Sequence, residues 1–303
     1  MDINFEYYKI FYYVAKYRNI TKASAALGSN QPNVTRIMKL LETQLNCRLF
    51  VREARGISLT QEGELFYSHV EVAYRHLLNA QEEIGRQDFP GYGTVEIGAT
   101  ETALHLFLIN ALHGFKREYP GVRIKIHNHT TPEILKNLIS GRLDLAVVTA
   151  PFEMPKAVSG VKMMDFEEIL VGGTQYKELG ERPMELEDIK KYPWIGVGTG
   201  SATYELYKNF FIEHKIDVEP DMEVATSDLL IPLIESNLGI GFVPEKMALP
   251  YLEEGKLIRI PLRGHIPERS IQIVSDKGRA RSLAADMFYR FLKNADKRNH
   301  QKG

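Results

Sequence analysis

Between residues 31 and 39 the sequence places an amide, a hydroxyl and two cations at helical spacing. At about 100° per residue, these polar groups gather on one side of a helix while the opposite side is apolar. The polar side consists of Gln31, Pro32, Thr35, Arg36 and Lys39, and the apolar side of Val34, Ile37, Met38, Leu41 and Leu45. Amides pair with adenine edges, guanidinium groups with guanine edges, and hydroxyls with bases or phosphates. The polar side is therefore a candidate surface for reading DNA.

Two further helices are expected to position this surface. The sequence predicts a helix over residues 5–17 and a short second helix through residues 21–27, which Asn19 caps and which small side chains dominate. A turn at 28–30 follows, and Asn30 is the expected N-cap of the third helix, which runs to about residue 45. This arrangement is a helix-turn-helix, whose second helix enters the major groove. The alternative is an ordinary amphipathic surface helix.

Residues 48–60 predict a two-stranded wing beside the third helix. Segments 49–51 and 57–59 can pair, with residues 53–56 at the tip. Arg52 and Arg55 would project from this wing, and the negative potential of a narrow minor groove attracts arginine. The alternative is a solvated turn that carries two arginines.

The distribution of charge agrees with an anionic partner for the N-terminal region. The net charge of the chain is −1, but residues 1–60 carry nine Lys/Arg against four Asp/Glu. A basic block of this kind indicates nucleic acid as the first candidate partner. One cysteine, Cys47, excludes an intrachain disulfide framework and fits a reducing compartment. Without an apolar run of about 18 residues or a secretory signal, we expect a cytoplasmic protein with no membrane partner.

Residues 11–63 resemble the LysR-type transcriptional regulators. The matching positions are Gln31-Pro32, Thr35-Arg36, Leu41-Glu42, Leu49-Phe50, Arg52, Leu59-Thr60 and Gly63. The sequence departs from the family pattern at Ser24, Asn33, Leu40 and Asn46, where the family usually has an alanine, a small apolar residue, a basic or polar residue, and a glycine. Asn33 and Leu40 bear on which operator is bound, so Asn33 joins the predicted DNA-contacting residues. The resemblance implies a bacterial transcription regulator with a winged helix-turn-helix over residues 1–60, and RNA polymerase is a further candidate partner.

A long helix is expected after the wing, over residues 61–87. Apolar side chains recur along it with alternating spacings of four and three residues, at Phe66, Val70, Ala73, Leu77, Ala80 and Ile84. Such a heptad pattern predicts pairing with an identical helix, and hence a homodimer on an operator with two half-sites. The alternative is packing against the protein's own domains. The resemblance implies a dimerisation linker, with tetramers as a further state, and residues 88–91 are a candidate hinge.

From residue 92 onward the pattern alternates between strands and helices. Strands are predicted over 94–99, 122–127, 143–149, 169–173, 194–197, 239–243, 257–260 and 270–274. This predicts an α/β domain with a mainly parallel sheet. The resemblance, which is weaker here, implies a two-lobed fold like that of periplasmic binding proteins, with lobe I over 92–163 and 268–303 and lobe II over 164–267. It also implies that a small effector binds between the lobes.

Several predicted junctions between a strand and a helix are rich in hydroxyl groups. Helix N-termini have unpaired N–H groups, and such junctions gather at the carboxyl ends of strands, where ligands bind. The candidate effector-binding residues are Thr100, Glu101, Thr102, His129, Thr130, Thr149, Gly200, Ser201, Thr203 and Thr226. The alternative is that Ser and Thr serve here only as N-caps. Glu101 would repel an anion and favours an effector with an amine or another hydrogen-donating group, unless it faces solvent.

Enzymatic alternatives find little support in the sequence. A G-x-S-x-G elbow, a G-x-G-x-x-G loop and a Walker sequence are all absent. His127 and His129 would share one face of a strand and could ligate a metal, but no acidic or cysteine ligand is adjacent in sequence. We therefore predict no catalytic residue, metal or cofactor. A solute-binding protein fits the C-terminal half alone, and the basic N-terminal block argues against it. The prediction is a DNA-binding regulator that responds to a small effector.

Overall fold

The computed structural model describes residues 3–53, 56–85 and 91–299, and the chain divides into two compact units, Met1–Asp88 and Phe89–Gly303. Arg55 and most of the predicted hinge over 88–91 lie outside the described residues. Within the described ranges no helix is both long enough and apolar enough to cross a membrane.

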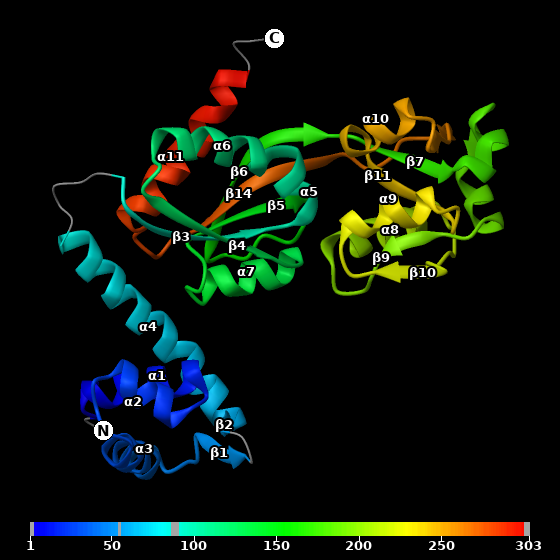
Figure 1. The fold of residues 1–303 in the computed structure, drawn as a ribbon. Coiled ribbons are helices and arrows are strands. Elements are labelled where there is room, and N and C mark those ends of the chain that lie inside the picture. The colour runs from blue at the N-terminus through cyan, green and yellow to red at the C-terminus, as the bar shows by residue number, and fades with distance from the viewer. Residues whose placement is uncertain (1–2, 54–55, 86–90, 300–303) are drawn as a thin grey trace. The chain divides into compact units, whose positions relative to one another are not determined.

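The N-terminal unit is a helical domain with one hairpin (Figure 1). Its elements are α1 (Phe5–Tyr17), α2 (Ile20–Ala26), α3 (Gln31–Leu45), β1 (Phe50–Glu53), β2 (Gly56–Leu59) and α4 (Gln61–Gly85). Asn19 and Asn30 cap α2 and α3, because each side chain accepts a hydrogen bond from a backbone N–H of the first turn. Asn46 ends α3 in the left-handed conformation, with φ of 52°. Asparagine tolerates this conformation, which explains why it can replace the glycine that the family usually has here.

Aromatic side chains hold this unit together. Phe11 of α1 is fully buried, and its ring lies 5.4 Å from that of Phe50 in the hairpin and 4.9 Å from that of Phe66 in α4. One ring of α1 therefore contacts both the wing and the start of the long helix. The first half of α4 belongs to this core, since Val70 is 5% exposed.

The C-terminal unit contains two lobes. We call residues 91–166 and 269–299 lobe I, because they contribute to one five-stranded sheet, and residues 167–268 lobe II. The sheet of lobe I has the order β4-β3-β5-β14-β6, with β3 (Gly93–Ala99), β4 (Val122–Asn128), β5 (Leu145–Ala150), β6 (Val158–Phe166) and β14 (Arg269–Asp276). Its helices are α5 (Glu101–Ala103), the π-helical turn η1 (Leu104–Leu108), α6 (Ile109–Glu118), α7 (Thr131–Ile139) and α11 (Leu283–Asn299).

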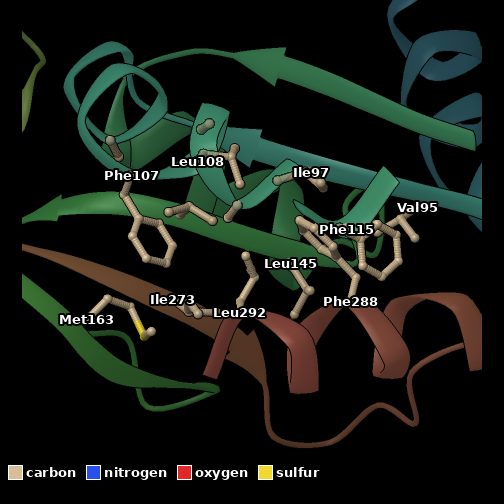
Figure 2. Packing of buried hydrophobic residues seen from close by; sticks show 14 of the residues in the cluster. Val95, Ile97, Phe107, Leu108, Phe115, Leu145, Met163, Ile273, Phe288 and Leu292 are labelled. Atoms are coloured by element: carbon tan, nitrogen blue, oxygen red, sulfur yellow. The ribbon is translucent and has the colours of Figure 1, made fainter. Parts of the chain in front are cut away.

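The sheet of lobe I is buried on both faces. Ile97 and Leu145 pack with Phe115 of α6 and Phe288 of α11 on one face (Figure 2). On the other face α7 packs against alternate residues of β5 and β14. Strands that helices cover on both sides read as continuous apolar runs, as β5 does. The carboxyl ends of β3, β4 and β5 therefore open onto one edge of a rigid scaffold.

Lobe II is built on smaller sheets. Its main sheet has the order β11-β7-β12, with β7 (Glu168–Gly173), β11 (Ile240–Pro244) and β12 (Leu257–Arg259). Two further pairs of strands are present. They are β9 (Ile195–Val197) with β10 (Met222–Val224), and β8 (Met184–Glu185) with β13 (Leu262–Arg263). The helices are η2 (Thr174–Gly180), η3 (Leu186–Lys191), α8 (Ala202–Glu213), η4 (Ser227–Leu229), α9 (Leu230–Glu235) and α10 (Glu245–Glu253). Trp194 lies in the core of this lobe, with its ring 5.7 Å from Phe211 and 5.1 Å from Phe242.

The eight strands predicted from the sequence all fall on observed strands, but the expectation of mainly parallel pairing is corrected. In lobe I, β14 lies antiparallel to both β5 and β6, and the main sheet of lobe II is antiparallel throughout. The reason is the direction of the chain. It enters lobe II at the end of β6 and returns from lobe II at the start of β14, so the neighbouring strands β6 and β14 run in opposite directions. The sequence reasoning also missed β6, in which exposed positions such as Gly160 and Lys162 separate the buried ones.

Candidate functional site

The polar side of α3 is exposed in the N-terminal unit. Gln31, Pro32, Arg36 and Lys39 are exposed, while Thr35 and Asn33 are half-buried. The opposite side faces the core, where Val34 and Leu41 are fully buried. The helix thus has the two faces that its sequence predicts, one packed and one presented to solvent.

Asn33 holds Arg36 in place on this exposed side. Its Oδ1 accepts a hydrogen bond of 3.1 Å from Nη2 of Arg36, and its Nδ2 donates to Oγ of Ser29 at 3.2 Å. Asn33 thereby connects the turn before α3 to a guanidinium group that points away from the core. A residue that departs from the family pattern orients one of the predicted base-contacting residues.

The predicted wing forms as a two-stranded hairpin. Phe50 pairs with Leu59 and Arg52 with Ile57, and the Arg52 side chain is exposed. Glu42 of α3 fixes this hairpin, because its Oε1 accepts hydrogen bonds from the backbone N–H of Leu49 at 2.7 Å and of Phe50 at 3.1 Å. The sequence reasoning did not assign this role to Glu42. An exposed wing arginine is therefore set beside α3 by a carboxylate of α3 itself.

Thr60 and Gly63 join the wing to the long helix. Thr60 Oγ1 donates to the carbonyl of Arg48 at 2.6 Å and accepts from the N–H of Gly63 at 2.9 Å. A Cβ on Gly63 would lie 2.1 Å from the carbonyl oxygen of Leu49, so only glycine fits this close approach. These motif residues therefore have a structural role at the junction of the wing and α4.

The heptad positions of α4 divide into two groups. Phe66 and Val70 pack in the core of their own unit. The prediction that these two face a partner helix is therefore corrected, because the first turns of α4 complete the helix-turn-helix core. The remaining positions, Ala73, Leu77, Ala80 and Ile84, are exposed, with Leu77 at 43% and Ile84 at 70%.

In the C-terminal unit, nine of the ten predicted effector-binding residues line one cavity. The cavity has a volume of about 40 Å³ and lies where β3, β4 and β5 of lobe I and β9 and β10 of lobe II end. Its lining comprises Thr100, Glu101, Thr102, Asn128, His129, Thr130, Thr131, Thr149, Val197, Ser201, Ala202, Thr203, Ala225, Thr226 and Ser227. Gly200, the tenth, lines an adjoining groove instead. The sequence reasoning missed Asn128, which directly precedes His129 at the end of β4.

The hydroxyl groups of the cavity are only partly used by the protein. Ser201 caps α8, since its Oγ accepts from the N–H of Tyr204 at 3.0 Å and donates to the carbonyl of Gly198 at 3.0 Å. Thr100 and Thr226 also occupy N-cap positions, but their side chains make no capping hydrogen bond. Thr100 is 9% exposed, and its buried Oγ1 has no hydrogen-bond partner among the described residues. Ser201 therefore acts as an N-cap through its side chain, whereas Thr100 does not.

Glu101 faces the cavity, not bulk solvent. Its side chain is 16% exposed, which contradicts the solvent-facing alternative. Oε2 accepts a hydrogen bond of 2.6 Å from Nδ2 of Asn128, and Oε1 lies 3.1 Å from Nε2 of His105. A carboxylate has about four lone-pair sites, so further acceptor capacity is left for a donor in the cavity.

A buried ion pair lies behind the cavity, at the point where the chain crosses between the lobes. Arg269 opens β14 and Glu168 opens β7, and Nη1 of the arginine donates to Oε1 of the carboxylate at 2.7 Å. Nη2 of Arg269 donates to Oγ1 of Thr149 in lobe I at 3.1 Å and to Oγ1 of Thr203 in lobe II at 3.0 Å. One guanidinium group therefore holds a cavity-lining hydroxyl from each lobe.

Tyr207 completes this buried group. Its hydroxyl donates to Oε2 of Glu168. Burial raises the pKa of Tyr207 well above its usual value, and the Glu168 carboxylate raises it further, so the phenol stays protonated and acts as a donor. The sequence reasoning missed Arg269, Glu168 and Tyr207, because long stretches of chain separate them and no local pattern connects them.

The two histidines considered as metal ligands contact different carboxylates. His127 Nε2 lies 2.6 Å from Oε2 of Glu96, and His129 Nδ1 lies 3.6 Å from Oε2 of Glu133. Across the described part of the chain, no group of three or more His, Cys, Asp or Glu side chains is placed to hold a metal ion. His129 instead lines the effector cavity.

Comparison with known proteins identifies both units. Residues 5–64 match the family model of the bacterial regulatory helix-turn-helix protein, lysR family, and residues 91–297 match the LysR substrate binding domain. The HTH-type transcriptional regulator YybE of Bacillus subtilis (strain 168) is 25% identical over 292 residues, which cover 96% of this chain and 98% of YybE.

Two solved structures show the same fold. Full-length CbnR complexed with its target DNA has a TM-score of 0.73 at 17% identity, and the match covers 96% of this chain and 99% of CbnR. The effector binding domain of QuiR in complex with shikimate has a TM-score of 0.61 at 18% identity, covering 68% of this chain and 98% of that domain. With family models matching both units, the chain belongs to the LysR family: it is a DNA-binding transcriptional regulator and not an enzyme.

Proposed function

We propose that this regulator binds an operator of two half-sites as a homodimer, with the polar side of α3 in the major groove and the wing beside it. The observation that supports the α3 assignment is that Gln31, Arg36 and Lys39 are exposed on a helix whose opposite side is packed. Gln31 and Arg36 contact base edges, and Thr35 and Lys39 contact bases or phosphates. Arg52, and Arg55 beside it in the sequence, contact the minor groove or its phosphates.

The dimer forms through the second half of α4. Leu77 and Ile84 are large apolar side chains that are exposed on this helix, and a second copy of the helix would bury them. Ala73 and Ala80 alternate with them at heptad spacing and allow close approach. A dimer formed in this way presents two recognition helices, and the tetramer and a contact with RNA polymerase are further expectations from the family. The site of action is the cytoplasm, where such a regulator meets DNA.

The C-terminal unit binds a small effector in the cavity between its lobes. The convergence of nine predicted residues from several junctions around one cavity supports this proposal, as does the QuiR domain of the same fold, which holds shikimate. The cavity presents many hydroxyl groups and one carboxylate, Glu101, so a ligand with hydrogen-donating groups suits it better than a simple anion. Arg269 donates hydrogen bonds to hydroxyl groups of both lobes, so a ligand that moves these hydroxyls would also move the residues where the lobes join. Closure of the lobes would change the spacing of the recognition helices and the bend of the DNA.

Selection of bound fragments from random and genomic DNA by the purified protein tests the DNA-binding part. An enriched interrupted palindrome is the expected result. Arg36→Ala is expected to relax base preference within the half-site, whereas Arg52→Ala lowers affinity more evenly across sequences. Lys9→Ala is the matched control, because it removes the same charge from α1, where Lys9 pairs with Glu6 at 3.3 Å. Weak binding without sequence preference that disappears at moderate salt would overturn the proposal.

A further inference from the structure

A large apolar groove adjoins the effector cavity. It has a volume of about 1290 Å³ and lies between α7 of lobe I and α8 of lobe II. The two spaces share Thr131, Ser201 and Ala202, so the groove continues from the cavity. Its apolar lining consists of Pro132, Leu135, Ile139, Pro151, Phe152, Pro155 and Leu206.

The two spaces differ in chemistry and in size. The cavity of about 40 Å³ accommodates only a small polar group, whereas the groove has room for a chain or ring. Thr100 lines the cavity, and its buried Oγ1 has no hydrogen-bond partner among the described residues. A ligand that fills both spaces would therefore have a polar end and an apolar end.

The charges around the two spaces favour a neutral or cationic ligand. The groove is lined by the carboxylates Glu153, Glu205 and Glu213 and by a single cation, Lys136. Glu101 adds a carboxylate at the cavity. An anionic ligand would meet like charge at both ends, so an amine or an alcohol is better suited than a carboxylic acid.

We propose that the effector of this regulator is an amphipathic small molecule, with a neutral or cationic hydrogen-donating head in the cavity and an apolar tail in the groove between α7 and α8. This inference rests on the proposed effector role of the cavity and adds the chemical class of the ligand. Each methylene that the groove buries raises the affinity by about two- to fourfold. The Thr100 hydroxyl and the Glu101 carboxylate bind the head.

Titration calorimetry of the full-length protein with butylamine, hexylamine, octylamine, hexanol and hexanoate tests the proposal. We expect affinity to rise with chain length among the amines and hexanoate to bind at least about tenfold more weakly than hexylamine. Ile139→Asp places a charge in the groove at a position that is 38% exposed, and it is expected to abolish the dependence on chain length. Leu206→Gln serves as a second groove variant should the first affect folding. Ile212→Asp is the matched control, because Ile212 is 60% exposed on α8 and does not line the groove.

The head and the tail are tested separately. Thr100→Val is expected to weaken all three amines by about five- to tenfold while the chain-length dependence stays unchanged. Affinity that is independent of chain length, or a dependence that survives both groove variants, would overturn the tail assignment. Tighter binding of hexanoate than of hexylamine would overturn the head assignment. If no probe binds while the protein still selects its operator, the proposed ligand class is wrong and the DNA-binding proposal stands. If the protein does not select an operator, the DNA-binding proposal itself is wrong.

Discussion

Thr100 offers a sharp test of whether the cavity is built for a ligand or only for the fold. The Thr100→Val substitution replaces one buried hydroxyl by a methyl group of nearly the same shape. In most places this change removes a hydrogen bond and destabilises a protein. Here Oγ1 has no partner among the described residues, and the residue makes no side-chain cap on α5. The usual penalty for the substitution is therefore absent.

The expected magnitude follows from these contacts. An unsatisfied buried polar group costs about 1–3 kcal/mol, and an apolar group of the same shape avoids that cost. The backbone contacts of Thr100 do not depend on its side chain, since its N–H donates to Val147 and its carbonyl accepts from Leu104. We therefore expect Thr100→Val to raise the free energy of unfolding of the C-terminal unit by about 1 kcal/mol. The same variant should bind effector more weakly.

Urea unfolding followed by tryptophan fluorescence measures this change. Trp194 is the single tryptophan of the chain and is buried in the C-terminal unit, so its emission reports the unfolding of that unit. Ser201→Ala is the matched control, because its hydroxyl caps α8 and also donates to Gly198. This control should lose about 1 kcal/mol of stability. A loss of more than about 1 kcal/mol in Thr100→Val would refute the reasoning, because it would mean that the hydroxyl has a stabilising partner.

Three further predictions test other parts of the structure. Gly63→Ala should lower the free energy of unfolding of the N-terminal unit by about 1–3 kcal/mol, measured by urea unfolding followed by far-UV circular dichroism, because its Cβ would overlap the carbonyl of Leu49. Arg269→Met should cost about 3–5 kcal/mol in the Trp194 assay, since it leaves a buried carboxylate without its cation, and the double variant with Glu168→Gln should recover part of this loss. Leu77→Asp should shift the protein from dimer to monomer in sedimentation velocity while the circular dichroism spectrum stays unchanged, and a dimer of undiminished affinity would exclude α4 from the interface.

Local patterns were sufficient to predict the helices and strands of the N-terminal unit. Each of its helices and strands depends on signals a few residues apart, such as the N-caps Asn19 and Asn30 and the apolar side of α3. The same local rules located the hydroxyl-rich junctions of the C-terminal unit, because a strand followed by a helix places its connection at a fixed end of the sheet. Local spacing could not show that Phe66 and Val70 pack in their own unit, since a heptad pattern describes a buried face without specifying its partner.

Long-range contacts account for what sequence reasoning missed. Arg269 and Glu168 are far apart in the chain and meet only because β14 returns from lobe II beside β6. The direction of β14 likewise follows from the crossing between lobes and not from its own residues. The apolar groove is formed by one face of α7, one face of α8 and the segment 151–155, and the two helices are on different lobes. No pattern within either helix indicates that the two faces lie together.

Some residues of the family signature hold the fold together, whereas others belong to the proposed recognition surface, and hydrogen bonding distinguishes the two groups. Glu42, Thr60 and Gly63 match the family signature, and each helps to hold the wing in place: Glu42 and Thr60 through hydrogen bonds, and Gly63 by allowing the close approach of Leu49. A side chain whose hydrogen bonds are all made within the protein has little capacity left for a ligand. The proposed recognition residues are those that can still form hydrogen bonds with a ligand. They include the exposed guanidinium of Arg36 on α3 and the buried hydroxyl of Thr100. An unsatisfied buried hydroxyl destabilises the folded protein, so selection for stability alone would favour an apolar side chain at position 100. The unsatisfied hydroxyl of Thr100, in a cavity that adjoins an apolar groove, is therefore a more specific guide to the effector of this protein than its family membership.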